Sequence, residues 1–243
     1  EVYGLYQEYV RSIMRSSPYW TEEMDQKFEW VIGGWAAQPG TDGYGQSAAS
    51  TSPSSRLMTI AAYNGGWDEG EAPAEVNDEG FFKVLTYTPQ AGIPSALDFV
   101  ETQAQQQAQG ITYALGTYEA GPGYSLPNTI TAAQEEAESQ VMKSLAAGTG
   151  TLDIYLAQAY YGFDIQNFFT FSRGRYFWTS HARETSGGQA YPSWKALSLY
   201  NHEGLGDFLV TKTVSTPTRD LTPTAVRPAL ADAPMVSAYV TRD

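Results

Sequence analysis

The sequence predicts an α/β fold in which parallel strands alternate with helices. Strand-like and helix-like segments follow one another four times along residues 1–206, the pattern of parallel strands joined by helical crossovers. No G-x-G-x-x-G motif follows the first strand and no G-x-x-x-x-G-K-[ST] motif occurs, which removes the main support for a nucleotide-binding open sheet. Long aromatic and acidic loops instead follow the strands at their carboxyl ends. This arrangement favours a (β/α)8 barrel of the TIM type, in which active sites form at those ends.

The first three elements are a helix and two strands. Apolar residues recur at helical spacing over residues 3–16, so we expect an amphipathic helix that ends before Pro18. Residues 27–35 (KFEWVIGGW) and 56–63 (RLMTIAAY) are strand-like, and a glycine-containing loop follows each of them. The loop after the second of these strands is long and covers residues 64–80.

A third strand leads directly to a glutamate. Residues 93–109 are helix-like, with Pro94 suited to the first turn and Gly110 to the stop. Residues 111–118 (ITYALGTY) then form a strand, and Glu119 is the next residue.

Two helices are predicted after this strand. Thr131 and Gln134 have the spacing of a capping box, so we expect a helix over 131–147. Glycines at 148 and 150 then break the helical pattern, and a second helical segment covers 151–161.

The last predicted strand and helix precede a change in pattern. Residues 163–171 are strand-like and 192–202 are helix-like. From Phe208 onward the chain has short strand-like pieces rich in Thr, Val and Pro. We therefore expect a main domain over 1–206 and a β-rich segment over 207–243 that begins an accessory β-sandwich.

Composition excludes several function classes. The chain has 27 acidic and 14 basic side chains, a net charge of −13, which would repel nucleic acids and anionic membranes. It has no cysteine and only two histidines, so a thiolate site or a three-histidine zinc site is impossible. We expect no cofactor, no metal, no nucleic-acid partner and no membrane partner. Carboxylates are the reactive groups that the sequence has in quantity.

One acidic loop has a metal-binding alternative. Oxygen-rich clusters can hold Ca²⁺, but the spacing D-x-[DN]-x-[DN]-G is absent from this loop, so we interpret it as a solvated surface loop. Its acidic residues are Asp68, Glu69, Glu71, Asp78 and Glu79.

Glu119 is the candidate catalytic residue. It lies where a hydrophobic strand meets a Gly-Pro turn, Gly121-Pro122. Retaining glycoside hydrolysis needs a carboxylate held rigidly in this way, because the carboxylate attacks the anomeric carbon while a second carboxyl group about 5 Å away protonates the leaving oxygen. The alternative interpretation is a loop glutamate that binds backbone amides or calcium.

The segment 117–124 (TYEAGPGY) resembles the nucleophile strand, the seventh, of clan A glycoside hydrolases, which are retaining (β/α)8 enzymes. The resemblance covers about residues 1–205 and implies strands five to eight, with strands one to four missing from the chain. It also implies an acid/base that follows an asparagine at the end of strand four. Glu1 resembles that residue, since Glu1-Val2-Tyr3-Gly4 is similar to such a run cut after its asparagine; the alternative is a surface glutamate at a chain end.

The position of the remaining candidates implies substrate binding. On the resemblance, Tyr63 holds the nucleophile ionised, whereas an ordinary core tyrosine is the alternative. Aromatic side chains after the strands suit stacking on sugar rings, although each of them could also be plain packing. The candidate substrate-binding residues are Trp35, Tyr63, Asn64, Trp67, Tyr118, Trp178 and His181.

The expected function is that of a retaining hydrolase that cleaves a polysaccharide or oligosaccharide by double displacement. Its expected partners are the carbohydrate and the remainder of its own barrel, as a separate or missing segment. The implied polymeric substrate points to extracellular or periplasmic action. Two alternatives stay open: a non-catalytic carbohydrate-binding barrel, and a structural α/β domain of a larger assembly.

Overall fold

The computed structural model separates into two compact units, each assembled from discontinuous pieces of the chain. Unit 1 comprises Glu1–Ala61, Ser95–Glu119 and Tyr161–Asn167, and unit 2 comprises Ala62–Pro94, Ala120–Tyr160 and Phe168–Asp243. The structure describes residues 1–63, 76–82, 85, 88–122, 131–172, 179–203, 206–208, 215–223 and 229–242, with backbone alone for 88–92. The predicted domain boundary between residues 206 and 207 stays a prediction.

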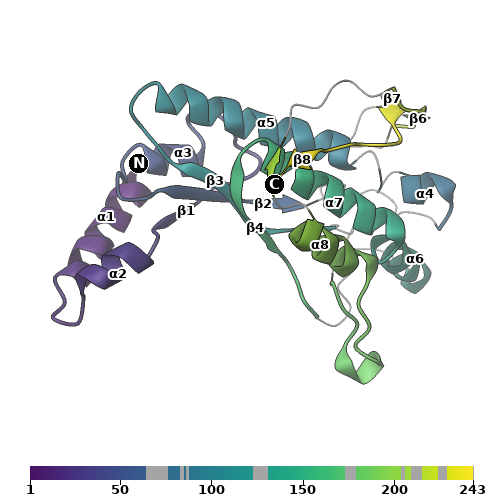
Figure 1. The fold of residues 1–243 in the computed structure, drawn as a ribbon, viewed down its shortest axis with the longest axis horizontal. Coiled ribbons are helices and arrows are strands. Elements are labelled where there is room, and N and C mark those ends of the chain that lie inside the picture. Colours follow the sequence, from purple (N-terminus) through teal and green to yellow (C-terminus); the bar gives the residue numbers. More distant parts are fainter. Residues whose placement is uncertain are drawn as a thin grey trace. The chain divides into compact units, whose positions relative to one another are not determined.

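The chain has a mixed α/β fold with a four-stranded parallel sheet. Its strands are β1 (Val31–Gly33), β2 (Leu57–Tyr63), β3 (Ala114–Gly121) and β4 (Phe163–Phe168), which confirms the four predicted strands. They lie side by side in the order β1-β2-β3-β4, and Val31 pairs with Leu57 in the parallel register (Figure 1). Spatial order therefore follows chain order, without the reversal that marks a doubly wound sheet.

The core of unit 1 lies between the sheet and two helices, α3 (Tyr44–Ala49) and α5 (Thr88–Gln107). Alternate residues of β2, Met58 and Ile60, face these helices, as the period of two along a strand requires. Each large apolar side chain buried here, such as Phe99, contributes about 1.5–3 kcal/mol. The buried members are Ile32, Ala48, Ala49, Met58, Ile60, Ala96, Phe99, Tyr113, Leu115 and Phe163.

Two short helices of unit 1 correct the sequence prediction. Helix α2 (Glu22–Lys27) begins at Thr21, whose side chain accepts a hydrogen bond from the Met24 amide, and its first turn is acidic. Strand β1 is therefore much shorter than the predicted strand over 27–35. Helix α3 lies in a stretch rich in Gly, Ser and Ala, in which apolar residues do not recur at helical spacing. Small residues are needed there because the helix packs closely on β2: a Cβ on Gly45 would lie 2.6 Å from the Met58 sulfur.

A buried polar network links α3, α5 and Tyr113, the residue before β3, within unit 1. Gln106 Nε2 donates to the carbonyl oxygen of Gln46 at 3.1 Å, and the Tyr113 hydroxyl donates to Gln106 Oε1 at 2.6 Å. Gln46 Nε2 in turn donates to the Pro39 carbonyl at 2.8 Å. Burial raises the pKa of Tyr113 to about 12, so its hydroxyl remains a donor.

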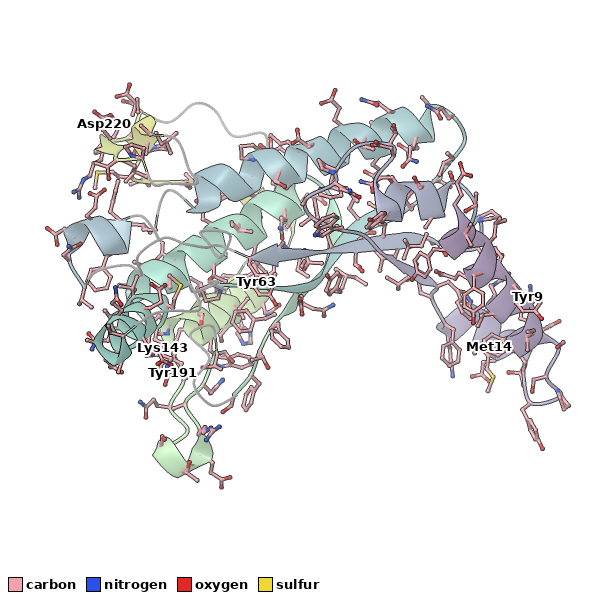
Figure 2. All side chains as sticks on the ribbon, turned by 180° about the vertical axis from the view of Figure 1, so that it is seen from behind. Tyr9, Met14, Tyr63, Lys143, Tyr191 and Asp220 are labelled. Atoms are coloured by element: carbon pink, nitrogen blue, oxygen red, sulfur yellow. The ribbon has the colours of Figure 1, made fainter. Side chains whose placement is uncertain are left out.

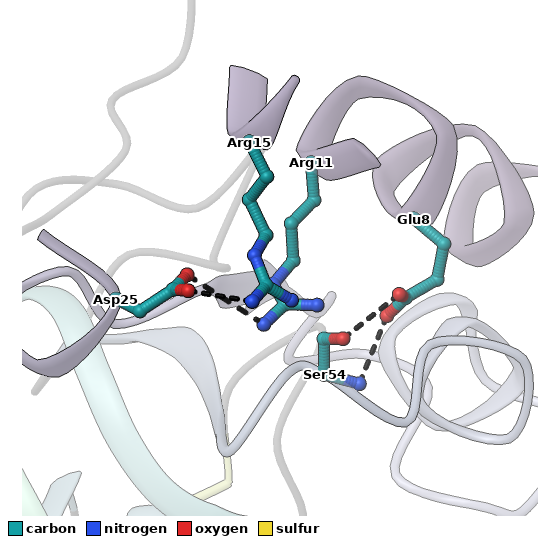
Figure 3. Close-up of polar contacts among 5 residues, drawn as sticks. All are labelled: Glu8, Arg11, Arg15, Asp25 and Ser54. Carbon is teal, nitrogen blue, oxygen red and sulfur yellow. Dashed lines mark hydrogen bonds and ion pairs between the residues drawn. The ribbon is translucent and has the colours of Figure 1, made fainter. Parts of the chain in front are cut away.

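Helix α1 (Val2–Arg15) contacts the rest of unit 1 through polar side chains (Figure 3). Glu8 accepts hydrogen bonds from the amide and hydroxyl of Ser54, and Arg15 forms an ion pair with Asp25 at 2.7 Å. The Ser54 and Ser52 hydrogen bonds hold the pKa of the Glu8 carboxyl below its usual value, although burial acts in the opposite direction and is the largest single influence.

Unit 2 contains three further long helices, α6 (Ala132–Met142), α7 (Leu145–Tyr160) and α8 (Pro192–Glu203). The capping box at Thr131 and Gln134 is present, as predicted. The break after α6 falls at residues 143–144, so the predicted break at residues 148–150 is wrong. Gly148 lies inside α7 because the helix packs closely on α8: a Cβ there would lie 2.8 Å from Pro192.

The segment before Ser95 also differs from the prediction. Helix α5 begins at Thr88 and not at the first turn expected around Pro94, which lies inside it. The missing amide hydrogen of one proline costs a single helical bond, and burial of Ala96 and Phe99 offsets that cost. Helix α4 (Asp78–Phe82) lies in the stretch predicted as a long loop.

In the described residues after α8, unit 2 contains two short antiparallel pairs of strands. Strand β5 (Asp207–Phe208) pairs with β8 (Thr241–Arg242), and β6 (Thr218–Leu221) pairs with β7 (Leu230–Pro234). Arg219 forms an ion pair with Glu79 of α4 at 3.1 Å. On α7, Asp153 accepts hydrogen bonds from the hydroxyls of Tyr239 at 2.9 Å and Ser237 at 3.0 Å. Among the helices that the structure describes, none is long and apolar enough to cross a membrane.

Replacing Gly4 by Ala tests the contact between α1 and α3. A Cβ at Gly4 would overlap the Ala48 carbonyl oxygen and Thr51 Oγ1, so we expect Gly4→Ala to lower the free energy of unfolding by about 1–3 kcal/mol in urea denaturation. Gly33→Ala is the matched control, since no atom lies within 4 Å of its Cβ position. Equal stability of the two variants would contradict the contact.

Asp153 gives a pH prediction. Burial raises the pKa of Asp153 above 3.8, and the Tyr239 and Ser237 hydrogen bonds oppose that shift. Because the folded pKa exceeds the unfolded one, Asp153 contributes stability below pH about 4 that is lost as pH rises through the folded pKa. We therefore expect the wild type to gain stability relative to Asp153→Asn as pH falls from 7 to 4 in urea denaturation. If the stability difference between wild type and Asp153→Asn did not change between pH 7 and pH 4, the raised pKa of Asp153 would be contradicted. Asp164→Asn, at an exposed position, is the control.

Candidate functional site

Glu119 lies within β3, two residues before its carboxyl end at Gly121, and not directly after a strand over 111–118 as the sequence predicts. The neighbouring Ala120 is fully buried and packs against Tyr155 of α7 and Leu197 of α8. Because successive side chains of a strand point to opposite faces, Glu119 leaves β3 on the face away from Ala120, and it is partly exposed.

Strand β4 fixes the backbone just before Glu119. The Asn167 amide donates to Thr117 Oγ1 at 3.2 Å, and Asn167 Nδ2 donates to the Thr117 carbonyl oxygen at 3.1 Å. Thr117 is completely buried. The end of β3 is therefore held by two hydrogen bonds in addition to sheet pairing, which suits a side chain that must be positioned accurately.

Tyr118 precedes Glu119 in β3. Burial, and to a smaller extent the charge of Glu119, raises the pKa of Tyr118. The hydroxyl is thus protonated at neutral pH and can donate a hydrogen bond. Almost half of the Tyr118 side chain is exposed, at 47%, so a ligand could reach it.

Trp35 follows β1 at the same edge of the sheet and stacks on Tyr44, the first residue of α3. The two ring centroids lie 5.8 Å apart and the planes differ by 16°. Both rings remain exposed, Trp35 at 45% and Tyr44 at 65%. Each ring covers part of the other, and the part of an aromatic face that stays exposed is a surface of the kind that binds the C–H face of a sugar.

Glu1 is not brought to Glu119. Its carbonyl oxygen accepts a hydrogen bond from Thr51 Oγ1 at 2.8 Å, and Thr51 lies in the segment that leads into the amino end of β2. Further along α1, Gln7 donates to Ser55 at 2.8 Å, just before the same strand. Glu1 therefore lies towards the amino ends of the strands in unit 1, whereas Glu119 lies near a carboxyl end.

The remaining described candidates belong to unit 2. Tyr63 is the last residue of β2 (Figure 2). Burial raises the pKa of Tyr155, and the nearby Tyr200 and Tyr63 raise it further. The predicted role of Tyr63 beside the nucleophile stays a prediction. His181 follows β4 and packs between Phe171 and Trp194, with ring centroids 4.4 Å and 4.8 Å away.

His181 also lines a cavity of about 370 Å³ in unit 2. Its Nδ1 lies 3.0 Å from the Ser180 hydroxyl, and Glu184 at the start of the 3₁₀ helix η2 (Glu184–Ser186) lines the same cavity. The cavity presents an imidazole, a carboxylate and an aromatic ring, which are groups able to bind hydroxyl-rich ligands.

Three predicted site residues, Asn64, Trp67 and Trp178, lie outside the described residues. Within the described part of the chain, no group of three or more His, Asp or Glu side chains could hold a metal ion.

Several neighbours of the candidates were missed by the sequence analysis. Tyr44 is the first residue of α3 and Trp194 is the third residue of α8, so an aromatic residue in the first turn of a helix is the signal that could have found both. Asn167 lies in strand β4, and its side chain donates a hydrogen bond to the neighbouring strand. The sequence does not distinguish such an asparagine from one whose side chain faces solvent.

The comparisons with known proteins find a fold likeness only. No protein-family model matches the chain, and no curated protein matches it. Among solved structures it is similar to the GH51 arabinofuranosidase from Xanthomonas axonopodis pv. citri, with 13% sequence identity and a TM-score of 0.53. The match covers 80% of this chain and 38% of that chain, so this chain spans well under half of its structural neighbour. At this identity the likeness concerns the fold, and that neighbour is a clan A glycoside hydrolase.

Thr117→Val tests how the end of β3 is held. Valine keeps the shape of threonine but leaves the Asn167 amide without its acceptor, so we expect a loss of about 1–3 kcal/mol in the free energy of unfolding. Thr216→Val, at an exposed hydroxyl that bonds only the adjacent Pro217 carbonyl, is the control and should cost less than about 0.5 kcal/mol in the same urea titration. Equal losses would show that the hydrogen bond does not hold the strand.

Proposed function

We propose that the chain is part of the (β/α)8 catalytic domain of a retaining glycosidase, with Glu119 as the nucleophile. The observation that carries the proposal is the position of Glu119: a partly exposed carboxylate near the carboxyl end of a central strand in a parallel sheet. Carboxyl ends of parallel strands are where barrels place catalytic residues. The fold likeness to a glycoside hydrolase supports the same assignment.

The strand order supports a barrel in preference to an open sheet. Parallel crossovers are right-handed, so consecutive strands added always in one direction place their helices on one face. The order β1-β2-β3-β4 has this property, and α3 and α5 share one core cluster. We infer that these are four consecutive strands of the barrel, the fifth to the eighth, and that residues 207–243 begin an accessory β-domain.

The proposed reaction is a double displacement. Glu119 attacks the anomeric carbon to form a glycosyl-enzyme, while a second carboxyl group about 5 Å away first protonates the leaving oxygen and then activates water. Glu1, the residue expected for that second role, lies towards the other end of the strands in unit 1. We therefore propose that the acid/base comes from outside unit 1. No cofactor takes part in this reaction.

The proposed substrate is a polysaccharide or oligosaccharide. The exposed pair of Trp35 and Tyr44 supports binding of a sugar ring near the same edge of the sheet as Glu119. Extracellular or periplasmic action follows from a polymeric substrate and stays part of the proposal.

A second candidate function is carbohydrate binding without catalysis. The same stacked rings favour it, because an exposed aromatic surface binds sugar whether or not a nucleophile is present. The two functions differ in one property: only the catalytic one forms a covalent bond between Glu119 and C1 of the sugar.

Glu119→Gln separates the two functions. In the natural protein that contains this chain, we expect the substitution to lower kcat/KM on aryl glycosides by on the order of a thousandfold or more, since the amide cannot act as nucleophile. Glu29→Gln, at an exposed site, is the matched control and should leave the rate unchanged. A 2-deoxy-2-fluoro glycoside should label Glu119 in the wild type, as read by peptide mass spectrometry.

Two results would overturn the catalytic assignment. One is undiminished hydrolysis by Glu119→Gln. The other is a wild type that binds oligosaccharides but neither hydrolyses them nor accepts the label, which would identify a binding domain.

A further inference from the structure

Residues 179–191 form an arm between the end of β4 and α8, with η2 at its tip (Figure 1). Backbone hydrogen bonds hold the inner part of the arm on two sides. The Ser180 amide donates to the Thr170 carbonyl oxygen at 2.9 Å, and the Ala182 amide donates to the Gln189 carbonyl oxygen at 2.9 Å. The backbone of the arm is therefore ordered before a ligand binds, which lowers the entropic cost of binding.

Three aromatic rings lie together at the base of this arm. Phe171 and Trp194 meet edge to face, with ring centroids 6.4 Å apart and an interplanar angle of 89°, and His181 packs against both. Despite these contacts, Phe171 is 62% exposed and Trp194 is 43% exposed. Packing within unit 2 therefore does not account for most of the Phe171 surface, and a group of exposed rings is typical of a binding surface.

Phe171 and His181 both line the cavity of about 370 Å³. Two consecutive glycines, Gly187 and Gly188, form part of its wall, at φ angles of +94° and +60°. Residues other than glycine rarely adopt such angles, so this part of the wall is backbone and no side chain from these positions fills the cavity. The volume of the cavity lies within the range of ligand pockets, which is about 300–1,000 Å³.

The polar groups of the cavity are hydrogen-bond acceptors. The Ser180 hydroxyl donates its single hydrogen to the Phe171 carbonyl oxygen at 3.2 Å. It therefore accepts from His181 Nδ1, 3.0 Å away, which leaves Nε2 of the neutral imidazole as an acceptor. The Ser172 hydroxyl likewise donates to a backbone carbonyl oxygen, and the exposed Glu184 supplies carboxylate oxygens. A ligand with several donors, such as the hydroxyl groups of a sugar, fits this arrangement.

We propose that this cavity is a subsite for one uncharged sugar unit of a polymeric substrate. The C–H face of the sugar ring stacks on Phe171, and its hydroxyl groups donate to His181 Nε2 and to Glu184. The subsite rests on the proposed function in one respect: the sugar bound here belongs to the same chain that Glu119 cleaves. The substrate is then a polymer or long oligosaccharide that is bound through more than one of its units.

The continuity of the arm with the sheet supports a shared substrate. The Phe169 amide donates to the Ala120 carbonyl oxygen at 2.8 Å, and Ala120 directly follows Glu119 in β3. Thr170 and Phe171 are the next residues after Phe169, so the chain reaches the subsite within two residues of its pairing with β3.

Charge selects against acidic polysaccharides at this subsite. Among the described residues that line the cavity, Glu184 is the one that is charged when His181 is neutral, and the whole chain carries a net charge of −13. A uronic acid or a sulfated sugar would therefore be repelled, whereas a neutral sugar would not.

Affinity gel electrophoresis of the natural protein that contains this chain tests the subsite. The soluble probes are arabinan, arabinoxylan, galactomannan and β-glucan, with polygalacturonate as the acidic probe. All variants carry Glu119→Gln, so that hydrolysis does not remove the probe. We expect binding to one or more neutral probes, and we expect Phe171→Ala to weaken that binding by about fivefold or more. Phe28→Ala is the matched control and should leave the affinity unchanged, because Phe28 is also exposed, at 56%, and contacts the Trp20 ring.

Two further variants separate the ligand contacts from packing of the rings. His181→Phe keeps an aromatic ring against Phe171 and Trp194 but removes the acceptor, so we expect the affinity to fall by about threefold or more. Phe171→Tyr keeps the stacking face and should bind like the parent protein.

Three results would overturn the subsite. They are no binding to any neutral probe, tighter binding to polygalacturonate than to the neutral probes, and parent-like affinity in either Phe171→Ala or His181→Phe. Failure of the proposed function gives a different result: Glu119→Gln would not reduce hydrolysis, whereas Phe171→Ala and His181→Phe would still weaken binding. The subsite would then stand without the catalytic assignment.

Discussion

Parallel pairing of four consecutive strands is the constraint on which the rest of unit 1 depends. Because β1 to β4 add in one direction, α3 and α5 pack on the same face, and one apolar cluster holds sheet and helices together. The same pairing brings the carboxyl ends of the strands to one edge. Trp35 and Glu119 therefore lie at the same edge without any direct interaction between them, and the backbone hydrogen bonds of the sheet position both.

Much of this could be predicted from the sequence because it depends on periodicity. Strands were predicted over 56–63 and 111–118 and a helix over 192–202, and β2, β3 and α8 lie within three residues of those bounds. The capping box at Thr131 was predicted at its own position. The prediction was wrong where a close contact between two elements, and not a periodic pattern of apolar residues, determines the residue type. Glycines that read as a break in a helix, such as Gly148, are there because another helix touches the backbone.

Single residues of the candidate site could be predicted from the sequence, but which of them lie next to one another could not. A glutamate at the end of a strand can be recognised from its neighbours, whereas the partner of Trp35 depends on how α3 folds back, which the composition of residues 36–50 did not indicate. Glu1 shows the limit most clearly. A resemblance in four residues suggested a role, but the direction in which α1 runs depends on contacts with Ser54 and Thr51 that no local motif encodes.

The buried polar network of α3, α5 and Tyr113 has an evolutionary consequence. Gln106 of α5 and Tyr113 bond each other through their side chains, whereas Gln106 reaches Gln46 at its backbone carbonyl oxygen, which any residue at position 46 would keep. Losing either of these two side chains leaves the other without its partner in a place that water does not reach, so a single change is selected against while a joint change to apolar residues is tolerated. Relatives of this protein should therefore vary at positions 106 and 113 together.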